Sequence, residues 1–408
     1  MPAEVLAQVV SRRKQCGRIA LGGITVFLFQ LLFITSLQWQ LLFASTGLLL
    51  LVVAALPMWF ERPRVTLVEG CLAFRIPWLA LLGLLGVRGA DGEWLNSAFF
   101  SAIVALVGYS SVRLLASDSR FRECLQRLFA LTFVVLFLQA TWLFFANSGA
   151  GGVAVRKYLI ELPAGNSNSI AMLLSMLGLF LAFGTESRRA RSSWLVLVAL
   201  AALMLSSTGN YLVLVCLMVF WLLRQSSRIR LRRSSVVLVA LLVAFLLAAA
   251  VFAFDSFAGS LEGIFARVVK AGGDLLAGDV TSATTQRTII YQHYLGEVGQ
   301  NFWLGNGTLP YEGGFENYAG MRPHNLVLEA LYQGGLFNLV AYGLAIFIAY
   351  RNIPAGSETN GVRLAVLFMI LDSMLEPGLF VMNKDFLFWV IMASVGERRE
   401  YEERHAIV

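Results

Sequence analysis

A long polar segment of the chain is followed by a strongly apolar one at Met321-Arg322-Pro323-His324-Asn325-Leu326-Val327-Leu328-Glu329. The residues before this stretch are rich in polar side chains and glycine, and those after it are predominantly apolar. His324 is therefore predicted to lie where water meets a membrane, at the positive, N-terminal end of a helix. We expect the rest of the chain to be a scaffold that holds this junction.

The composition around this stretch is that of a membrane protein. Of the 408 residues, 58% are hydrophobic and 14% are charged, whereas soluble domains carry about 25% charged residues. Apolar runs near the length of a bilayer recur along the chain, and helices satisfy their own backbone groups there. The fold class predicted is an all-α polytopic membrane protein. The net charge of +7 does not indicate nucleic-acid binding, because the basic residues are spread through short loops.

About 12 transmembrane helices are predicted from these apolar runs. Two of them are separated only by the turn Ser207-Thr208-Gly209-Asn210, so together they could form one broken helix. The expected ranges are 19–36, 41–60, 66–87, 95–115, 127–147, 168–184, 193–206, 211–223, 236–254, 324–350, 363–379 and 384–397.

The basic residues predict the orientation of these helices. With the N-terminus inside, the inner segments hold most of the 32 lysines and arginines, as the positive-inside rule requires. Both ends are therefore expected in the cytoplasm. The first apolar run follows a basic stretch as a signal peptide does, but no convincing cleavage site follows, so we interpret it as a retained helix.

This topology divides the chain into four parts. Residues 1–254 form a bundle of about nine helices, 255–323 a large outer loop, 324–397 about three further helices, and 398–408 a cytoplasmic tail. The outer loop is far longer than an ordinary connection. Its apolar spacing predicts a short helix on the outer leaflet near 261–269 and a second helix near 283–300.

His324 is the first candidate catalytic residue. It is the only one of the three histidines predicted at an outward-facing helix start. A neutral imidazole there could act as a general base on a sugar hydroxyl, and the free backbone N–H groups of the helix start could bind an anion. The alternative is a histidine that only caps the helix or lies at the membrane interface.

Arg287 is the second candidate catalytic residue, because a guanidinium binds phosphate oxygens in a bidentate way. The alternative is a solvated arginine or one that contacts a lipid headgroup. Tyr291 and Tyr294 share its predicted helix face. Arg322, Arg156 and Lys157 could add positive charge to the same site. Asn166 either caps the sixth predicted span or lines the substrate site.

A few charged residues lie in or near the predicted spans, namely Glu69, Arg75, Asp372 and Glu376. Intramembrane charges are functional candidates by default, but Glu69 and Arg75 are close enough in sequence to form a structural pair. The chain contains no HExxH, Walker A, GxSxG or CxxC pattern. We therefore expect no metal site and no cofactor.

Two stretches resemble the O-antigen ligase and O-antigen polymerase superfamily of bacterial inner-membrane glycosyltransferases. One is Arg287-Thr288-Ile289-Ile290-Tyr291 with Phe302-Trp303-Leu304-Gly305-Asn306-Gly307, and the other is His324-Asn325-Leu326-Val327-Leu328-Glu329-Ala330-Leu331-Tyr332-Gln333-Gly334-Gly335-Leu336-Phe337. In that family an arginine of the large periplasmic loop precedes a histidine–asparagine pair at the start of a glycine-bearing helix. The order is the same here.

The resemblance implies an inverting, metal-independent transfer in the periplasm. The donor would be a glycan on undecaprenyl diphosphate, and the acceptor a sugar hydroxyl of lipid A-core or of a growing glycan. Arg287 would then hold the diphosphate and His324 would activate or position the acceptor, with Asn325 and Tyr291 among the substrate-binding residues.

The chain departs from the family in one short outer turn. Ligases usually carry a second arginine after this turn, which here is Ser206-Ser207-Thr208-Gly209-Asn210. Either Arg156, Lys157 or Arg322 takes the place of this second arginine, or the substrate differs. Asn210, which lies in the turn, is included among the predicted substrate-binding residues.

A ligase for lipid A-core is the first hypothesis and a repeat-unit polymerase the second, and no residue decides between them. A protein O-glycosyltransferase is less favoured. A polysaccharide transporter is also less favoured, because no repeat between halves and no matched pair of broken spans is visible.

Overall fold

A computed structural model describes most of the chain. The described residues are 3–61, 65–84, 98–147, 159–205, 207–226, 287–307, 323–354, 359–376 and 378–395, together with residue 356 and short pieces between 269 and 277. The predicted span 236–254 and most of the predicted helix at 261–269 lie outside these residues.

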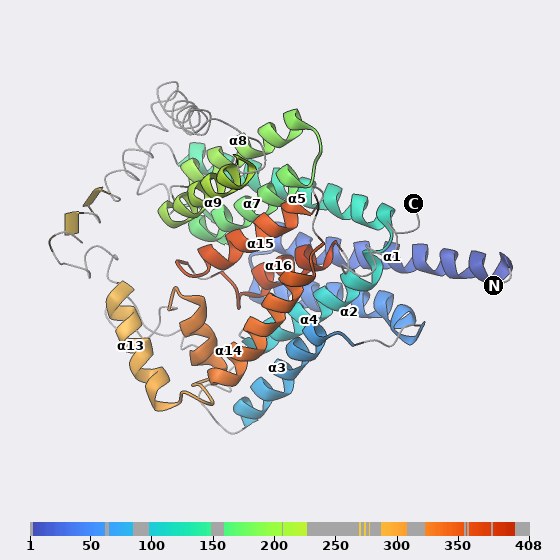
Figure 1. Cartoon of the computed structure of the whole chain (residues 1–408), viewed down its shortest axis with the longest axis horizontal. Coiled ribbons are helices and arrows are strands. Elements are labelled where there is room, and N and C mark those ends of the chain that lie inside the picture. Colours follow the sequence, from blue (N-terminus) through green and yellow to red (C-terminus); the bar gives the residue numbers. More distant parts are fainter. Residues whose placement is uncertain are drawn as a thin grey trace.

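The described part of the chain is mostly helical, and every predicted span within it coincides with a helix (Figure 1). These helices are α1 (Ala3–Phe33), α2 (Leu37–Glu61), α3 (Leu67–Leu84), α4 (Ala98–Leu115), α5 (Ser119–Ala146), α7 (Ser167–Phe183), α8 (Arg188–Met204), α9 (Thr208–Ser226), α14 (Leu326–Asn352), α15 (Asn360–Asp372) and α16 (Met382–Ala393). The predicted loop helix near 283–300 is α13 (Arg287–Gln300). Residues 205–207 separate α8 from α9, which are two helices.

Four of the described helices, α1, α2, α5 and α14, are long and apolar enough to cross a membrane. Together with the largely apolar surface, they agree with an all-α membrane protein. A small exception is the antiparallel hairpin of β1 (Glu161–Leu162) and β2 (Gly165–Asn166), which the sequence did not predict.

Two helices, α7 and α16, lie at the centre of the bundle, as the burial of nearly all of their residues shows. In α7 every residue from Ile170 to Phe183 is buried, and in α16 every residue from Met382 to Ala393 is buried. α7 is apolar nearly all round, and so is α16 after its first turn, which holds Asn383, Lys384 and Asp385; a helix that is apolar on all sides belongs in the interior of a helical protein. α7 packs on α5, α8 and α15, while α16 packs on α4, so these two helices join the two halves of the chain.

α15 is shorter than predicted. The predicted span 363–379 ends at Asp372, where the chain leaves the helix and returns to α16 through residues 373–381. Pro377 explains part of this, because the residue before a proline is disfavoured in the helical region. The early end leaves Glu376 outside the helix.

α14 is a broken helix. Gly334 (φ −149°) and Gly335 (φ 65°) leave the helical conformation, so the helix divides into an outer half, 326–333, and an inner half, 336–352. Residue 335 adopts a left-handed conformation, which glycine takes without strain. The prediction of one continuous span was wrong at this point.

The segment that follows α13 fills the break. The Asn306 N–H donates to the Tyr332 carbonyl at 2.5 Å, and the Leu336 N–H donates to the Phe302 carbonyl at 2.9 Å. The Trp78 indole of α3 donates to the Gly334 carbonyl at 2.9 Å. The Tyr332 and Gly334 carbonyls and the Leu336 N–H thus have partners at the break, as non-helical backbone inside a membrane protein requires.

α13 lies beside the outer half of α14, at the opposite end of the molecule from the N-terminal end of α1 (Figure 1). Its apolar face packs on α14 in a small separate core made of Ile290, Tyr294, Val298, Leu331 and Tyr332. The break in α14, the segment 302–306 and this core together fix α13 next to the start of α14.

Candidate functional site

His324 lies immediately before α14, as the sequence predicted. Asn325 is the N-cap of the helix, and its side chain accepts hydrogen bonds from the N–H groups of Val327 and Leu328 at 3.0 and 3.1 Å. The His324 side chain is 20% exposed, so it is accessible at the edge of the bundle. Its backbone has a φ of 48°, in the left-handed region that few residues other than glycine occupy.

Glu376 faces the imidazole of His324. Its Oε2 lies 3.3 Å from Nδ1, and its side chain is only 8% exposed. The two atoms are at ion-pair distance, but Nδ1 makes no hydrogen bond of good geometry here. Catalytic contacts are often long before substrate binds, so the distance is the more informative observation.

Backbone hydrogen bonds join the segment that carries His324 to the segment that carries Glu376. The Leu326 N–H donates to the Ser373 carbonyl at 2.9 Å, which joins the start of α14 to the end of α15. The Glu376 N–H donates to the Asp372 carbonyl at 2.8 Å. His324 and Glu376 therefore lie at one corner of the bundle, where the start of α14 meets the end of α15, although they are 52 positions apart in sequence.

α13 reaches the same corner. The Tyr291 hydroxyl donates to the His324 carbonyl at 3.3 Å. α13 begins at Arg287, one turn before Tyr291 and on the same face. The side chain of Arg287 lies outside the described part of the chain, and its role at this site stays a prediction.

A buried polar chain continues inward from this corner. The Asn210 amide donates to Asp372 Oδ2 at 3.1 Å, and the Ser175 hydroxyl donates to Asn210 Oδ1 at 2.6 Å. Asn210, Ser175 and Asp372 are each completely buried. Asn210 thus links α9, α7 and α15, and its predicted contact with substrate stays a prediction.

The other predicted site residues are more scattered. Asn166 caps α7 by accepting a hydrogen bond from the Ser169 N–H at 3.0 Å, which is the capping alternative raised from the sequence. Asn325 has a capping role as well. Arg156, Lys157 and Arg322 lie outside the described residues.

The pairing of Glu69 with Arg75, which the sequence left open as the structural alternative, is not found in the structure. Glu69 instead binds Arg113 of α4 at 3.0 Å. Arg75 is completely buried, and its Nε donates to Asn338 Oδ1 at 2.9 Å. The face of its guanidinium lies over the rings of Tyr342, at 4.3 Å, and Phe380, at 5.1 Å. Glu69 and Arg75 are about two helix turns apart in sequence, but each finds its partner on another helix.

Arg75 also belongs to a buried polar layer that supports the broken helix. Asn338 donates to the Ala330 carbonyl at 3.0 Å, across the break in α14. Asp385 of α16 accepts hydrogen bonds from Tyr342, at 2.6 Å, and from Ser101. α3, α4, α14 and α16 are thereby joined by polar contacts as well as by apolar packing.

Sequence reasoning noticed Glu376 as a charge near a span but did not place it against His324. The signal that could have helped is the sequence Glu376-Pro377-Gly378, which predicts the end of a helix and a turn. A turn after α15 places the Glu376 carboxylate beside His324.

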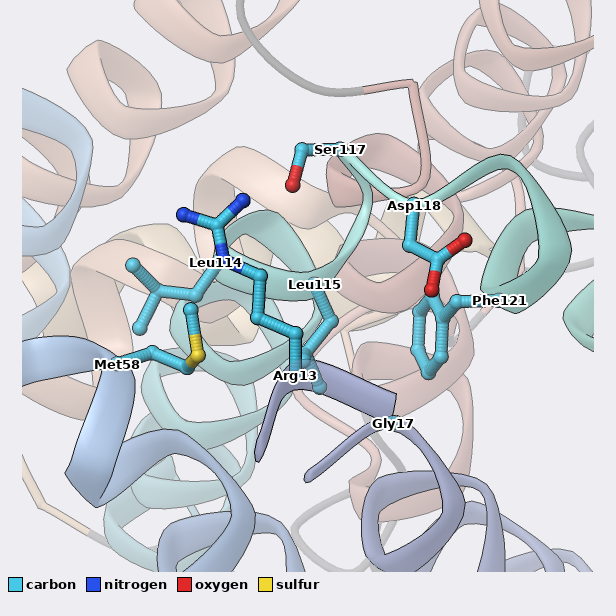
Figure 2. A pocket seen from close by; sticks show the side chains of 8 residues that line it. All are labelled: Arg13, Gly17, Met58, Leu114, Leu115, Ser117, Asp118 and Phe121. Carbon is cyan, nitrogen blue, oxygen red and sulfur yellow. The ribbon is translucent and has the colours of Figure 1, made fainter. Parts of the chain in front are cut away.

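A small pocket, with room for about one water molecule, lies elsewhere, where α4 ends and α5 begins (Figure 2). Its walls come from α1, α2, α4 and α5, and Arg13 and Asp118 supply its charged groups. None of the predicted site residues lines it. Among the described residues, no three His, Cys, Asp or Glu side chains gather as a metal site would need.

Residues 193–343 match the family model described as O-antigen ligase. The matched segment runs from α8 into the inner half of α14 and contains both Arg287 and His324. No curated protein matches the chain. The family match supports an enzyme with activity of the O-antigen ligase or polymerase type. Over residues 193–343 it confirms the resemblance to the O-antigen ligase and O-antigen polymerase superfamily that is seen in the sequence.

Proposed function

We propose that this chain is an O-antigen ligase-like glycosyltransferase of the bacterial inner membrane. It moves a glycan from undecaprenyl diphosphate to a sugar hydroxyl of lipid A-core on the periplasmic face. The observation that carries the proposal is the meeting of His324, Glu376 and the Arg287 end of α13 at one corner of the bundle. All but Glu376 lie inside the segment matched to the family.

The proposed reaction is a single displacement at the anomeric carbon. The acceptor oxygen forms a bond to this carbon, and the bond from the carbon to the diphosphate oxygen breaks with its electron pair leaving on the diphosphate. The proton of the acceptor hydroxyl passes to His324. Because the lipid diphosphate bond supplies the energy, the step needs no nucleotide and, in this proposal, no metal.

Arg287 is proposed to stabilise the leaving diphosphate. A guanidinium can form two parallel hydrogen bonds with phosphate oxygens, and such charge-assisted contacts are stronger than neutral ones. The N–H groups at the start of α14 are already bonded to Asn325 and to the Ser373 carbonyl, so the expectation of free N–H groups for an anion there was wrong. The positive end of the helix dipole is the contribution that α14 makes in this proposal. Arg156, Lys157 and Arg322 are proposed as further positive groups, and Tyr291, Asn325, Asn166 and Asn210 as groups near the substrates.

The proposed periplasmic location rests on two features. The basic residues concentrate in segments on the side of the N-terminus, which the positive-inside rule assigns to the cytoplasm. α13 lies at the other end of the molecule (Figure 1). The site would therefore face the periplasm, where lipid-linked glycans are used, with both termini in the cytoplasm.

The first prediction concerns the two candidate catalytic residues. In cells that lack the native gene, His324→Ala and Arg287→Ala should each fail to restore the surface glycan, while membrane abundance stays normal. Gel analysis of the glycan and quantification of the protein in membranes check this result.

Matched controls come from the same two helices. His293→Ala removes an exposed histidine of α13, and Arg351→Ala removes an exposed arginine of α14. Both controls should restore the glycan. Near-normal restoration by His324→Ala or by Arg287→Ala would reject the role proposed for that residue.

A repeat-unit polymerase is the second candidate function, because it shares the proposed chemistry and the family match does not separate the two. Deleting the gene in its source organism distinguishes them. A ligase mutant would lose all surface polymer and accumulate long chains on the carrier, whereas a polymerase mutant would carry single repeat units. Transfer to a protein acceptor and glycan transport are less favoured, and the same analysis would detect both.

A further inference from the structure

Glu376 lies outside the segment matched to the family, yet its carboxylate faces the candidate base. We propose that Glu376 is a positioning residue for His324. It holds the imidazole with Nδ1–H toward the carboxylate and leaves Nε2 free to accept the proton of the acceptor hydroxyl. This inference rests on the proposed function, in which His324 is the base.

The geometry supports an orienting role because the carboxylate is almost buried and its backbone is fixed. Glu376 Oε2 lies 3.3 Å from Nδ1, whereas His324 retains 20% exposure. One side of the ring therefore faces the protein interior and the other remains open. The hydrogen bond that one ring nitrogen makes determines which nitrogen is left to act as a base.

The connection that carries Glu376 is held on both sides. Ser373 uses its hydroxyl twice, donating to the Met369 carbonyl at 2.6 Å and accepting from the Leu379 N–H at 3.2 Å. Asp372, one turn before Glu376, is anchored to α9 and α7 through Asn210. Glu376 can therefore impose an orientation on His324.

The charged and titratable groups around the ring come from three elements. The end of α15 and the connection after it supply Asp372 and Glu376, and α13 supplies Tyr291, whose hydroxyl contacts the His324 carbonyl rather than the ring. Arg287 begins the same helix. Among the described side chains, the carboxylate of Glu376 lies at ion-pair distance from the His324 ring.

The chemical consequence appears when the proton moves. As the acceptor oxygen attacks, Nε2 takes its proton and the ring becomes an imidazolium. A carboxylate beside Nδ1 stabilises this cation, as the orienting aspartate does in a catalytic triad. Glu376→Gln keeps the shape of the side chain and removes the charge, so it should slow the chemical step and leave substrate affinity nearly unchanged.

The kinetic test uses purified full-length protein in lipid vesicles, with an undecaprenyl-diphosphate glycan and an acceptor glycolipid. Glu376→Gln should lower kcat about 100-fold, within the range that positioned proton transfer contributes, with KM for the acceptor within about twofold. Glu376→Asp keeps the charge but shortens the side chain and should lose less. Glu123→Gln is the matched control, because this glutamate of α5 is exposed and has Arg127 of the same helix as its partner.

The second readout does not depend on activity. ¹⁵N-histidine NMR of the substrate-free protein in bilayers, at a pH where imidazoles are neutral, reports which ring nitrogen carries the proton; His324→Asn identifies the signal. The wild type should show Nδ1–H, and Glu376→Gln should lose this preference. An unchanged tautomer, or a kcat within twofold of the wild type, would overturn the proposal.

The two proposals can fail separately. Normal transfer by His324→Asn would reject His324 as the base, whatever the tautomer result. Normal transfer by Glu376→Gln with a dead His324→Asn would reject only the positioning role. If Glu376→Gln does not fold, Glu376→Asp serves instead: a fall in kcat of fivefold or more supports the proposal, and an unchanged kcat overturns it.

Discussion

His324 has an uncommon backbone conformation for a residue other than glycine. Its φ of 48° lies in the left-handed region, which costs an ordinary residue about 1–2 kcal/mol. The bond from Tyr291 to its carbonyl and the cap made by Asn325 hold it there. Such strain persists only where the surrounding structure fixes it, and it is commonest at functional sites.

The left-handed conformation of His324 leads us to predict different stabilities for two variants at this position. Asn tolerates the left-handed region better than Ala does, so His324→Asn should be more stable than His324→Ala by about 1 kcal/mol. Both variants should be inactive, because neither can accept the proton. Thermal unfolding in detergent and the transfer assay check the two statements; equal stability of the two variants would show that the conformation at this position is not costly.

The positions of some polar residues could be predicted from the sequence, and the partners of others could not. His324 and Asn325 were placed correctly because a helix start is encoded locally, in a cap residue followed by an apolar run. The partners of Glu69 and Arg75 were not, because Arg113 and Asn338 are distant in sequence. Contacts of this kind depend on which helices pack together, and a single sequence with helical periodicity does not specify that.

At the scale of elements, the break in α14 decides where α13 lies. The segment 302–306 enters the break, and the backbone there is closely packed. A Cβ atom added at Gly335 would lie 2.1 Å from the Trp303 carbonyl oxygen, and one at Gly305 would lie 2.4 Å from the Gly335 nitrogen. These glycines allow two backbone segments to approach closely.

Gly335→Ala should therefore displace the segment 302–306. The added methyl group would clash with Trp303 and require a left-handed alanine, which together should destabilise the protein by at least about 1–2 kcal/mol. α13 should lose its place beside His324, so transfer should fall sharply. Thermal unfolding and kcat measure these effects.

Gly343→Ala is the control for this substitution. It lies on the inner half of the same helix, and a Cβ atom added there would meet no atom within 4 Å. Its stability and activity should match those of the wild type. Normal activity of Gly335→Ala would show that the docking of segment 302–306 does not position the site.

The helices were predictable where apolar runs of sufficient length define them, as for α2, α5 and the start of α14. The break was not predicted, although Gly334 and Gly335 are visible in the sequence. Glycine is common in transmembrane helices, and nothing local shows that the segment 302–306 will enter between the two halves. The early end of α15 was missed for the same reason, since Pro377 alone does not fix the path of the chain.

At the scale of the whole molecule, the bundle brings together parts of the chain from both sides of the large loop. The predicted loop supplies α13, the residues just before α14 supply His324, and the connection between α15 and α16 supplies Glu376. α7 and α9 reach the same region through Ser175 and Asn210. The apolar helices are thus the scaffold that the sequence suggested, and the candidate site lies at one end of it.

The most direct measurement is a single-turnover reaction of the purified protein in vesicles. Undecaprenyl-diphosphate glycan and an acceptor glycolipid are mixed with excess enzyme, with and without a divalent-metal chelator, and both products are quantified by mass spectrometry. We predict that glycosylated acceptor and free undecaprenyl diphosphate form in equal amounts, at a rate that the chelator does not change. His324→Asn should form neither product. Transfer by His324→Asn at the wild-type rate, or a loss with chelator that one specific metal restores, would contradict the account.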